Sequence, residues 1–81
     1  MTREEAKNEL KKIFKLVVHN GVNADIMTEE SDIRSDLGVD SIGMIYMAIA
    51  IEQTFGVDMS SVTVNTFKTV GDVITYICDK Q

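Results

Sequence analysis

The sequence predicts an all-α fold: a small bundle of four helices, three long and one short, with a long loop between the first two. Three observations predict it. Apolar residues recur at the three- and four-residue steps of a helix in three segments, and residues that favour helix ends flank these segments. The chain contains no proline that would interrupt a helix. Its 81 residues suffice for one domain, residues 1–81, with a single modest core.

The first helix is predicted from Thr2 onward. Thr2 and Glu5 have the spacing of a capping box, in which each side chain accepts the other residue's backbone amide. One apolar face follows, made of Ala6, Leu10, Ile13, Phe14 and Val17. Asn20 and Gly21 tolerate left-handed dihedrals and are expected to end the helix. His19 in the last turn is favourable to the helix dipole, a simpler interpretation than a catalytic role.

Residues 22–39 show no sustained apolar period. Their apolar residues are scattered among acids: Val22, Ile26, Ile33 and Leu37. This pattern is typical of a long loop that is anchored to the core at several points. Loops of this length within a compact domain are usually functional or disordered, and the anchors favour the ordered kind.

A second helix is predicted from Asp40, a good N-cap, to Phe55, with Gly56 as its terminator. Its broadest apolar side consists of Ile42, Ile45, Ala48, Ile49, Ile51 and Phe55. Further apolar residues extend this surface: Met44, Tyr46 and Met47. A helix this apolar is central in its fold or shows part of its surface to a partner, and both can hold together.

The segment at 57–68 is compatible with two structures. Alternating apolar residues permit a strand, whereas a short helical turn near residues 65–68 would supply the fourth helix. After it, Thr69 and Asp72 repeat the capping-box spacing. The last helix then shows one apolar face, made of Val70, Val73, Ile74 and Ile77, and ends in the polar residues 79–81.

The net charge of −5 is unevenly distributed. Residues 1–19 hold five cations and three acids, a net of +2, whereas the remainder holds three cations and ten acids, a net of −7. Six acids and only one cation, Arg34, lie between Asp25 and Asp40. This distribution disfavours nucleic acid binding, which needs a basic patch, and favours a basic protein partner. A merely solvated acidic loop is the alternative.

Several other classes of protein are disfavoured. No apolar run is long enough to span a bilayer, and the charged start differs from a secretory signal. Cys78 is the only cysteine, so no internal disulfide can form, which fits a reducing compartment. One cysteine and one histidine cannot make a plausible zinc site. We therefore expect a soluble monomer in the cytoplasm, with Cys78 as a partly buried structural residue.

Ser41 lies where the acidic loop meets the second helix, in the stretch DLGVDSIG at residues 36–43. Nucleophilic catalysis would need a base beside Ser41, and nothing in the sequence brings the only histidine close. The glycines have the wrong offsets for a nucleophile elbow, and the aspartates have the wrong spacing for a calcium loop. We expect no catalytic residues and no metal site. A helix N-terminus favours a phosphate on Ser41, although Asp40 would repel it, so physics allows this modification without requiring it.

The stretch DLGVDSIG resembles the attachment motif of acyl carrier proteins, whose core is D-x-G-x-D-S followed by a large aliphatic residue. The matching positions are Asp36, Gly38, Asp40, Ser41 and Ile42. The ending TVGDVITYI is similar to the family's T-V-x-D-x-x-x-Y-I. Together with the order of helices and loop, the resemblance covers nearly the whole chain.

The resemblance implies that Ser41 takes a phosphopantetheine arm from coenzyme A, transferred by a separate phosphopantetheinyl transferase. The arm would hold acyl groups as thioesters and present them to enzymes of fatty acid, polyketide or other specialised biosynthesis, such as an acyl ligase or a ketosynthase. The chain itself would be a non-catalytic carrier. Asp40 would help the transferase by engaging its metal or basic residues. The residues expected to recognise partners are Asp36, Asp40, Ile42, Met44 and Tyr46.

The second helix departs from the family's pattern. Carriers of the common fatty acid pathway display several acids there, whereas only Glu52 remains between Ile42 and Phe55. Positions where acids are expected hold other residues: Gly43, Met44, Tyr46, Gln53 and Thr54. Docking would then depend more on apolar contact and on the acidic loop, which favours a specialised carrier that serves a dedicated ligase or synthase.

Two alternatives remain open at this point. A peptidyl or aminoacyl carrier would use the same arm for an amino or hydroxy acid, although such carriers usually have fewer acids. An unmodified helical module would instead bind a partner helix through Met44, Tyr46 and Met47.

Overall fold

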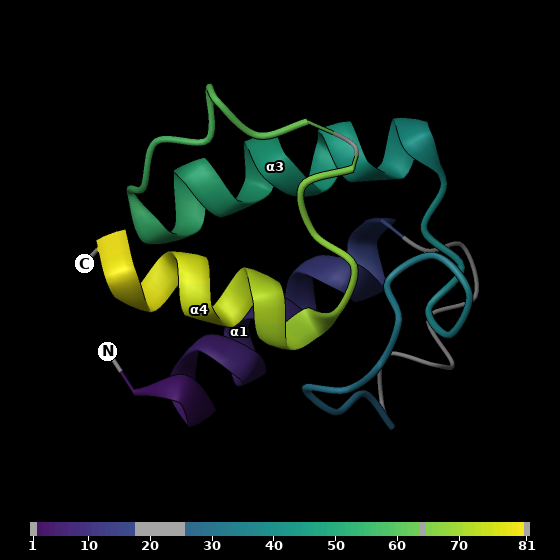
Figure 1. Ribbon diagram of the computed structural model, residues 1–81. Coiled ribbons are helices and arrows are strands. Elements are labelled where there is room, and N and C mark those ends of the chain that lie inside the picture. The colour runs from purple at the N-terminus through teal and green to yellow at the C-terminus, as the bar shows by residue number, and fades with distance from the viewer. Residues whose placement is uncertain (1, 18–25, 64, 81) are drawn as a thin grey trace.

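A computed structural model describes residues 2–17, 26–63 and 65–80 of the chain. Within these residues the regular elements are three α-helices, α1 (Arg3–Val17), α3 (Ser41–Phe55) and α4 (Val70–Lys80). α1 packs against both other helices, and the segment at 56–69 crosses from the end of α3 to the start of α4 (Figure 1). No strand forms in the described part, which contains one isolated bridge between Asp32 and Thr69. The all-α prediction is confirmed, but the count of four helices is not.

The helix starts follow the predicted capping residues. At α1 the backbone amide of Thr2 donates to Glu5 Oε1 at 3.0 Å, and the amide of Glu5 donates to Thr2 Oγ1 at 3.1 Å. At α4 the amide of Thr69 donates to Asp72 Oδ2 at 3.1 Å, and the amide of Asp72 donates to Thr69 Oγ1 at 3.3 Å. Both capping boxes are thus confirmed. The predicted end of the first helix, with His19, Asn20 and Gly21, lies outside the described residues.

α3 has the predicted bounds, and only part of its broad apolar side is buried. Gly56 ends it in the left-handed conformation, with φ of 69°, and donates its amide to the Glu52 carbonyl at 2.9 Å. The buried side of the helix consists of Gly43, Met44, Met47, Ile51 and Phe55. Three residues assigned to the broad apolar side are instead exposed: Ile42, Ile45 and Ile49. The apolar period of the sequence does not single out the side that packs on α1, because apolar residues surround the helix.

The segment at 57–68 forms neither predicted structure in its described part. The backbone instead makes two turns, in which Val62 donates to the Met59 carbonyl at 3.0 Å and Thr66 donates to the Thr63 carbonyl at 3.1 Å. Contacts with α4 hold the segment in place. The Tyr76 hydroxyl donates to the Asp58 carbonyl at 2.7 Å, and the Phe67 ring meets the Tyr76 ring edge-on. Side-chain contacts therefore replace a short helix or a strand ladder at this position.

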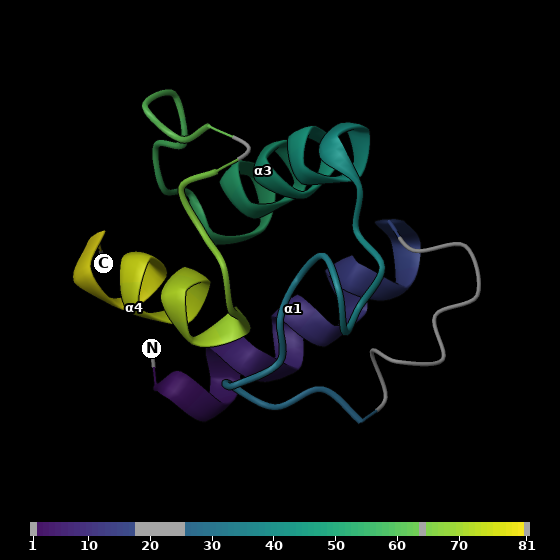
Figure 2. The same cartoon turned by 45° about the vertical axis from the view of Figure 1, so that its right-hand side comes forward.

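The loop at 26–39 pairs with the chain that enters α4, as Figure 2 shows. The amide of Ile33 donates to the Lys68 carbonyl at 2.9 Å, and the amide of Gly71 donates to the Glu29 carbonyl at 2.8 Å. The side chains of Ile33 and Leu37 are buried, as predicted, and Met27 and Val39 add two anchors that the sequence analysis missed. Ile26 is 75% exposed, so its prediction as an anchor was wrong, and Val22 lies outside the described residues.

The described helices are all short. None of them is both long enough and apolar enough to cross a membrane.

Candidate functional site: the serine at the start of α3

The first turn of α3 is organised by Asp40. Its backbone is extended, with φ of −87° and ψ of −175°, and its Oδ1 accepts the amide of Gly43 at 2.7 Å. The amide of Met44 then donates to the Asp40 carbonyl at 2.9 Å. Asp40 is thus the predicted N-cap. The amides of Ser41 and Ile42 have no acceptor within the helix, so the start of α3 provides donors and a positive dipole end for an anion.

Ser41 is the first residue of α3, and its side chain is exposed. Within the described residues no hydrogen bond involves its hydroxyl, so the oxygen is available to an approaching enzyme. No group of three histidine, cysteine, aspartate or glutamate side chains gathers in the described part where it could hold a metal ion. The geometry therefore leaves the Ser41 hydroxyl accessible at the start of α3.

The loop before Ser41 has its own hydrogen-bond network. Asp32 Oδ1 accepts the amides of Ser35 at 2.8 Å and Arg34 at 2.9 Å, and these bonds lower the pKa of the Asp32 carboxyl. Asp36 Oδ2 accepts the amide of Asp32 at 2.8 Å. Gly38 then takes the left-handed conformation, with φ of 74°. Asp36, predicted to recognise partners, is exposed and also holds the turn that leads to Ser41.

Gly43 lies at the site, and its structural role was not predicted from the sequence. A Cβ atom at this position would lie 3.0 Å from Val39 Cγ1 and 3.1 Å from Val17 Cγ1. The missing side chain lets the start of α3 approach the end of α1 and the loop closely. A glycine inside the first turn of a strongly apolar helix is the signal that could have indicated this contact.

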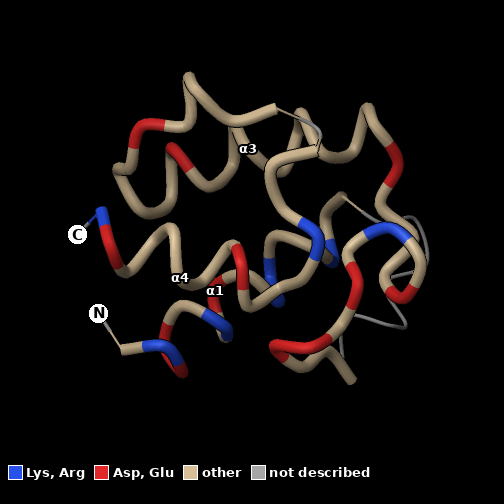
Figure 3. The backbone as a smooth tube through the Cα atoms, viewed as in Figure 1, with Lys and Arg blue, Asp and Glu red and all other residues tan. Residues whose placement is uncertain are grey.

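Four large side chains form an exposed apolar stripe along α3, and we call them the α3 stripe: Ile42 (63% exposed), Ile45 (54%), Tyr46 (61%) and Ile49 (49%). Their spacing places them on neighbouring turns of one side of the helix. Glu52 is the one charged residue of α3, and the rest of the helix is uncharged (Figure 3). Two of the predicted partner contacts, Ile42 and Tyr46, belong to this stripe. Met44 does not, because its side chain is only 3% exposed and packs inward.

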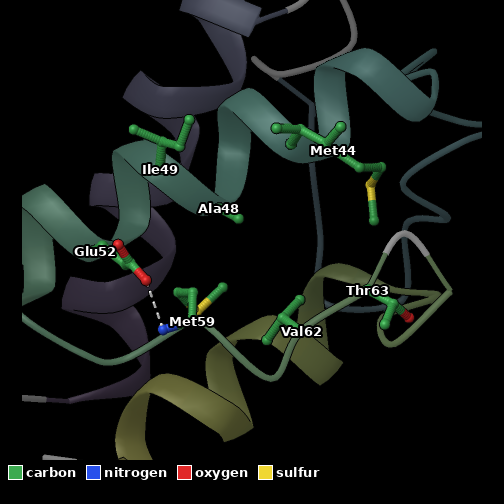
Figure 4. Close-up of a pocket in the computed structure, with 8 residues that line it drawn as sticks. Met44, Ala48, Ile49, Glu52, Met59, Val62 and Thr63 are labelled. Atoms are coloured by element: carbon green, nitrogen blue, oxygen red, sulfur yellow. Dashed lines mark hydrogen bonds between the residues drawn. The ribbon is translucent and has the colours of Figure 1, made fainter.

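An apolar cavity of about 450 Å³ lies between α3 and the turns at 59–63 (Figure 4). Its lining comes from both walls: Met44, Ile45, Ala48, Ile49 and Glu52 on α3, and Met59, Val62 and Thr63 opposite. The Glu52 carboxylate accepts the amide of Met59 at 2.8 Å across one end of the cavity. This cavity was not predicted from the sequence, because its opposite wall depends on the path of the segment at 57–63.

Comparisons with known proteins agree with this geometry. Residues 8–77 match the family model described as a phosphopantetheine attachment site. The acyl carrier protein of Coprothermobacter proteolyticus is 39% identical over 77 residues, which cover 95% of this chain and 92% of that protein. This chain belongs to the acyl carrier protein family. The structure of the acyl carrier protein from Enterococcus faecalis superposes with a TM-score of 0.70 at 32% identity, covering 100% of both chains.

Acyl carrier proteins carry their cargo on phosphopantetheine, and the residues at the start of α3 fit this group. The Ser41 hydroxyl is exposed, and the two amides without helical acceptors suit a phosphodiester oxygen. The protein is a carrier of acyl groups and not a catalyst. The family match supports a modified carrier over the alternative of an unmodified interaction module. Of the three residues which that alternative used, Met44 and Met47 are buried, whereas Tyr46 is 61% exposed.

Proposed function

We propose that Ser41 is the residue of this acyl carrier protein that takes the phosphopantetheine arm. One observation carries the proposal: within the D-x-G-x-D-S motif, the serine is the first residue of α3 and its exposed hydroxyl has no hydrogen bond in the described part. Phosphopantetheine, once attached, supplies a thiol that holds acyl groups as thioesters. The chain presents the arm, and the Gly43 contact and the loop network keep the start of α3 in place.

We further propose that the chain is the substrate of a phosphopantetheinyl transferase. The transferase would have to activate the Ser41 hydroxyl, since the described residues offer no base bonded to it. Asp40 is exposed, and Gly43 is bonded to only one of its carboxylate oxygens, Oδ1. The second oxygen can then meet a cation or a basic residue of the transferase. Asp36 extends this acidic edge.

The cavity beneath α3 favours an acyl cargo over an amino acid. Seven of its eight lining residues are apolar or threonine, and the eighth, Glu52, already accepts a backbone amide. Burial of a hydrocarbon chain between such walls is favourable, because it removes apolar surface from water. Burial of a charged amino group there would be unfavourable, because the group would lose its hydration. We propose that acyl chains attached through Ser41 lie in this cavity.

The α3 stripe is proposed as the contact for partner enzymes, together with Asp36 and Asp40. Its exposed isoleucines and tyrosine offer an apolar contact directly after Ser41, where any enzyme that acts on the arm has to approach. Only Glu52 is charged on α3, and it is engaged with Met59. This supports a specialised carrier that serves a dedicated ligase or synthase of fatty acid, polyketide or related biosynthesis, and we further propose that it acts in the cytoplasm.

Labelling by a transferase tests the attachment site. The purified chain is incubated with coenzyme A, magnesium and a phosphopantetheinyl transferase, and its intact mass is measured. We expect the mass of one arm on the wild type and no gain on Ser41→Ala. The matched control is Ser61→Ala, which removes another exposed serine and should still be labelled. A folded wild type that stays unlabelled, or a Ser41→Ala variant that gains the arm, would overturn the proposal.

A further inference from the structure

We propose that Glu52 limits the length of acyl chain that this carrier accommodates, because its bond to Met59 closes one end of the cavity beneath α3. The inference rests on the proposed function, since it takes the chain to be tethered at Ser41. Glu52 would then be a specificity-determining residue of the cavity, whose relevant features are its two walls, its closed end and its length.

The cavity has one regular wall and one irregular wall. α3 supplies the regular wall, whose positions are set by helical hydrogen bonds. The opposite wall consists of Met59, Val62 and Thr63, which lie in turns without a helix or strand ladder. The distance between the walls therefore depends on individual contacts that hold the turns against α3.

The Glu52–Met59 bond is the contact that joins the two walls directly. Both residues line the cavity, and Glu52 Oε1 accepts the Met59 amide at 2.8 Å (Figure 4). The side chain of Met59 is only 4% exposed, so its amide has little access to water as a substitute acceptor. A carboxylate that accepts a backbone amide forms one of the stronger kinds of hydrogen bond. Loss of this acceptor leaves the turn at Met59 without its tie to α3.

The position of this bond relative to Ser41 makes it a limit on length. Figure 4 shows Met44 and Thr63 at one end of the cavity and the Glu52–Met59 bond at the other. Met44 is one helical turn after Ser41, so we take the acyl chain on the Ser41 arm to enter the cavity at that end. α3 rises 1.5 Å per residue, so the cavity extends roughly 10 Å from Ile45 to Glu52. A medium-length chain fills this span, and a longer chain meets the closed end.

Thermal stabilisation by acyl chains of different length tests the inference. The wild type, Glu52→Ala and Glu52→Gln are loaded at Ser41 with butyryl, octanoyl and hexadecanoyl groups. The melting temperature of each form is compared with that of the same variant carrying the arm alone. We expect stabilisation of the wild type to rise from butyryl to octanoyl and then to stop. In Glu52→Ala we expect the further gain to continue to hexadecanoyl, because the end is open.

Glu52→Gln is the matched variant, because its amide oxygen can still accept the Met59 N–H while the charge is lost. It should keep the wild-type dependence on chain length. Amide exchange of Met59 is the second measurement and needs no cargo. We expect this amide to exchange roughly tenfold faster or more in Glu52→Ala than in Glu52→Gln, given the usual strength of hydrogen bonds to charged groups.

Three outcomes would overturn the inference, and they are distinguishable. A chain that takes no arm at Ser41 fails the proposed function itself. A wild type that takes the arm but is stabilised equally by all three groups shows that the cavity does not hold the chain. If the wild type discriminates and Glu52→Ala discriminates identically, Glu52 does not set the limit, although Ser41 still carries the arm.

Discussion

At the scale of single residues, presentation of Ser41 depends on a neighbour that has no side chain. Gly43 lies two positions after Ser41, and the space where its Cβ would lie is bounded by Val39, Val17 and the Asp40 carboxylate at 3.0 to 3.1 Å. Two of these neighbours belong to other parts of the fold, the loop and α1. The same glycine also donates its amide to the Asp40 cap. The orientation of the first turn of α3 is thus set through Gly43.

We expect Gly43→Ala to destabilise the protein by about 1 kcal/mol, because overpacking at three close contacts exceeds the gain in helix propensity from alanine. For a chain of this size the melting temperature should fall by roughly 4–8 °C. Thermal unfolding of the apo protein measures it. Ser41→Ala in the same turn is the control and should change stability by less than about 0.5 kcal/mol. A Gly43→Ala variant as stable as the wild type would show that Val39, Asp40 and Val17 can move aside without a measurable cost in stability.

At the scale of elements, α3 serves two surfaces at once. One side packs into the core through Met47, Ile51 and Phe55, while the α3 stripe stays exposed on another side. Both expectations for so apolar a helix, central packing and a surface for partners, are therefore compatible with this structure. The α3 stripe itself contains no charge, and Glu52, exposed one turn beyond Ile49, is the only charged residue of α3. Salt should therefore screen mainly the contributions of Glu52 and of the acids that precede Ser41.

The α3 stripe is tested by the rate of arm transfer to Ser41. We expect Ile42→Asn and Tyr46→Asn each to lower kcat/KM of the phosphopantetheinyl transferase by about tenfold, since each removes one large apolar contact. Neither side chain lines the cavity beneath α3, so the capacity of the cavity for an acyl chain should not change. The control is Gln53→Asn, an exposed polar position on the same helix. Unchanged rates in both stripe variants, with a steep loss in added salt, would indicate a purely electrostatic docking surface instead.

An element could be predicted from the sequence where the residues that determine it are close together along the chain. The capping pairs Thr2–Glu5 and Thr69–Asp72 act over three residues, and their spacing sufficed to predict both helix starts. Ser41 was predicted as a site from a motif of contiguous residues. The buried side of α3 could not be predicted, because apolar residues surround that helix and the choice depends on α1. The turns at 57–63 depend on bonds to Glu52 and Tyr76, which are distant in sequence.

At the scale of the whole molecule, carboxylates bind backbone amides and basic side chains at positions throughout the fold. Arg3 at the start of α1 forms an ion pair with Glu29 in the loop and donates to Thr75 Oγ1 on α4 at 3.2 Å. The bond with Arg3 lowers the pKa of the Glu29 carboxyl. Hydrogen bonds from backbone amides likewise lower the pKa values of four other carboxyls, those of Glu5, Asp32, Asp58 and Asp72. Stability of the whole fold is therefore coupled to pH.

We expect the protein to lose stability in acid. A lowered pKa means that the folded state binds protons more weakly than the unfolded chain, so this stabilisation is complete above the unfolded values of about 4 and is lost as pH falls through the folded values. The melting temperature should be nearly constant from about pH 7 to 5 and should fall below that.

Asp72→Asn provides the matched variant for this prediction, because the amide oxygen can still cap α4 but does not titrate. Its melting temperature should depend less on pH between about pH 5 and 2 than that of the wild type. Gln53→Asn, an exposed position on α3 that adds and removes no titratable group, should leave the dependence unchanged. A wild type whose melting temperature is constant down to about pH 2 would contradict the coupling.

The irregular wall beneath α3 has a consequence for how the carrier can work. Its turns are held by separate bonds, from the Met59 amide to Glu52 and from the Tyr76 hydroxyl to the Asp58 carbonyl. Each bond is local, so its loss would unravel no neighbouring turn, in contrast to the cooperative melting of a helix. We therefore expect the turns between these two bonds to adjust to successive cargoes, while the Glu52 bond holds its end of the cavity and the platform that displays Ser41 keeps its shape.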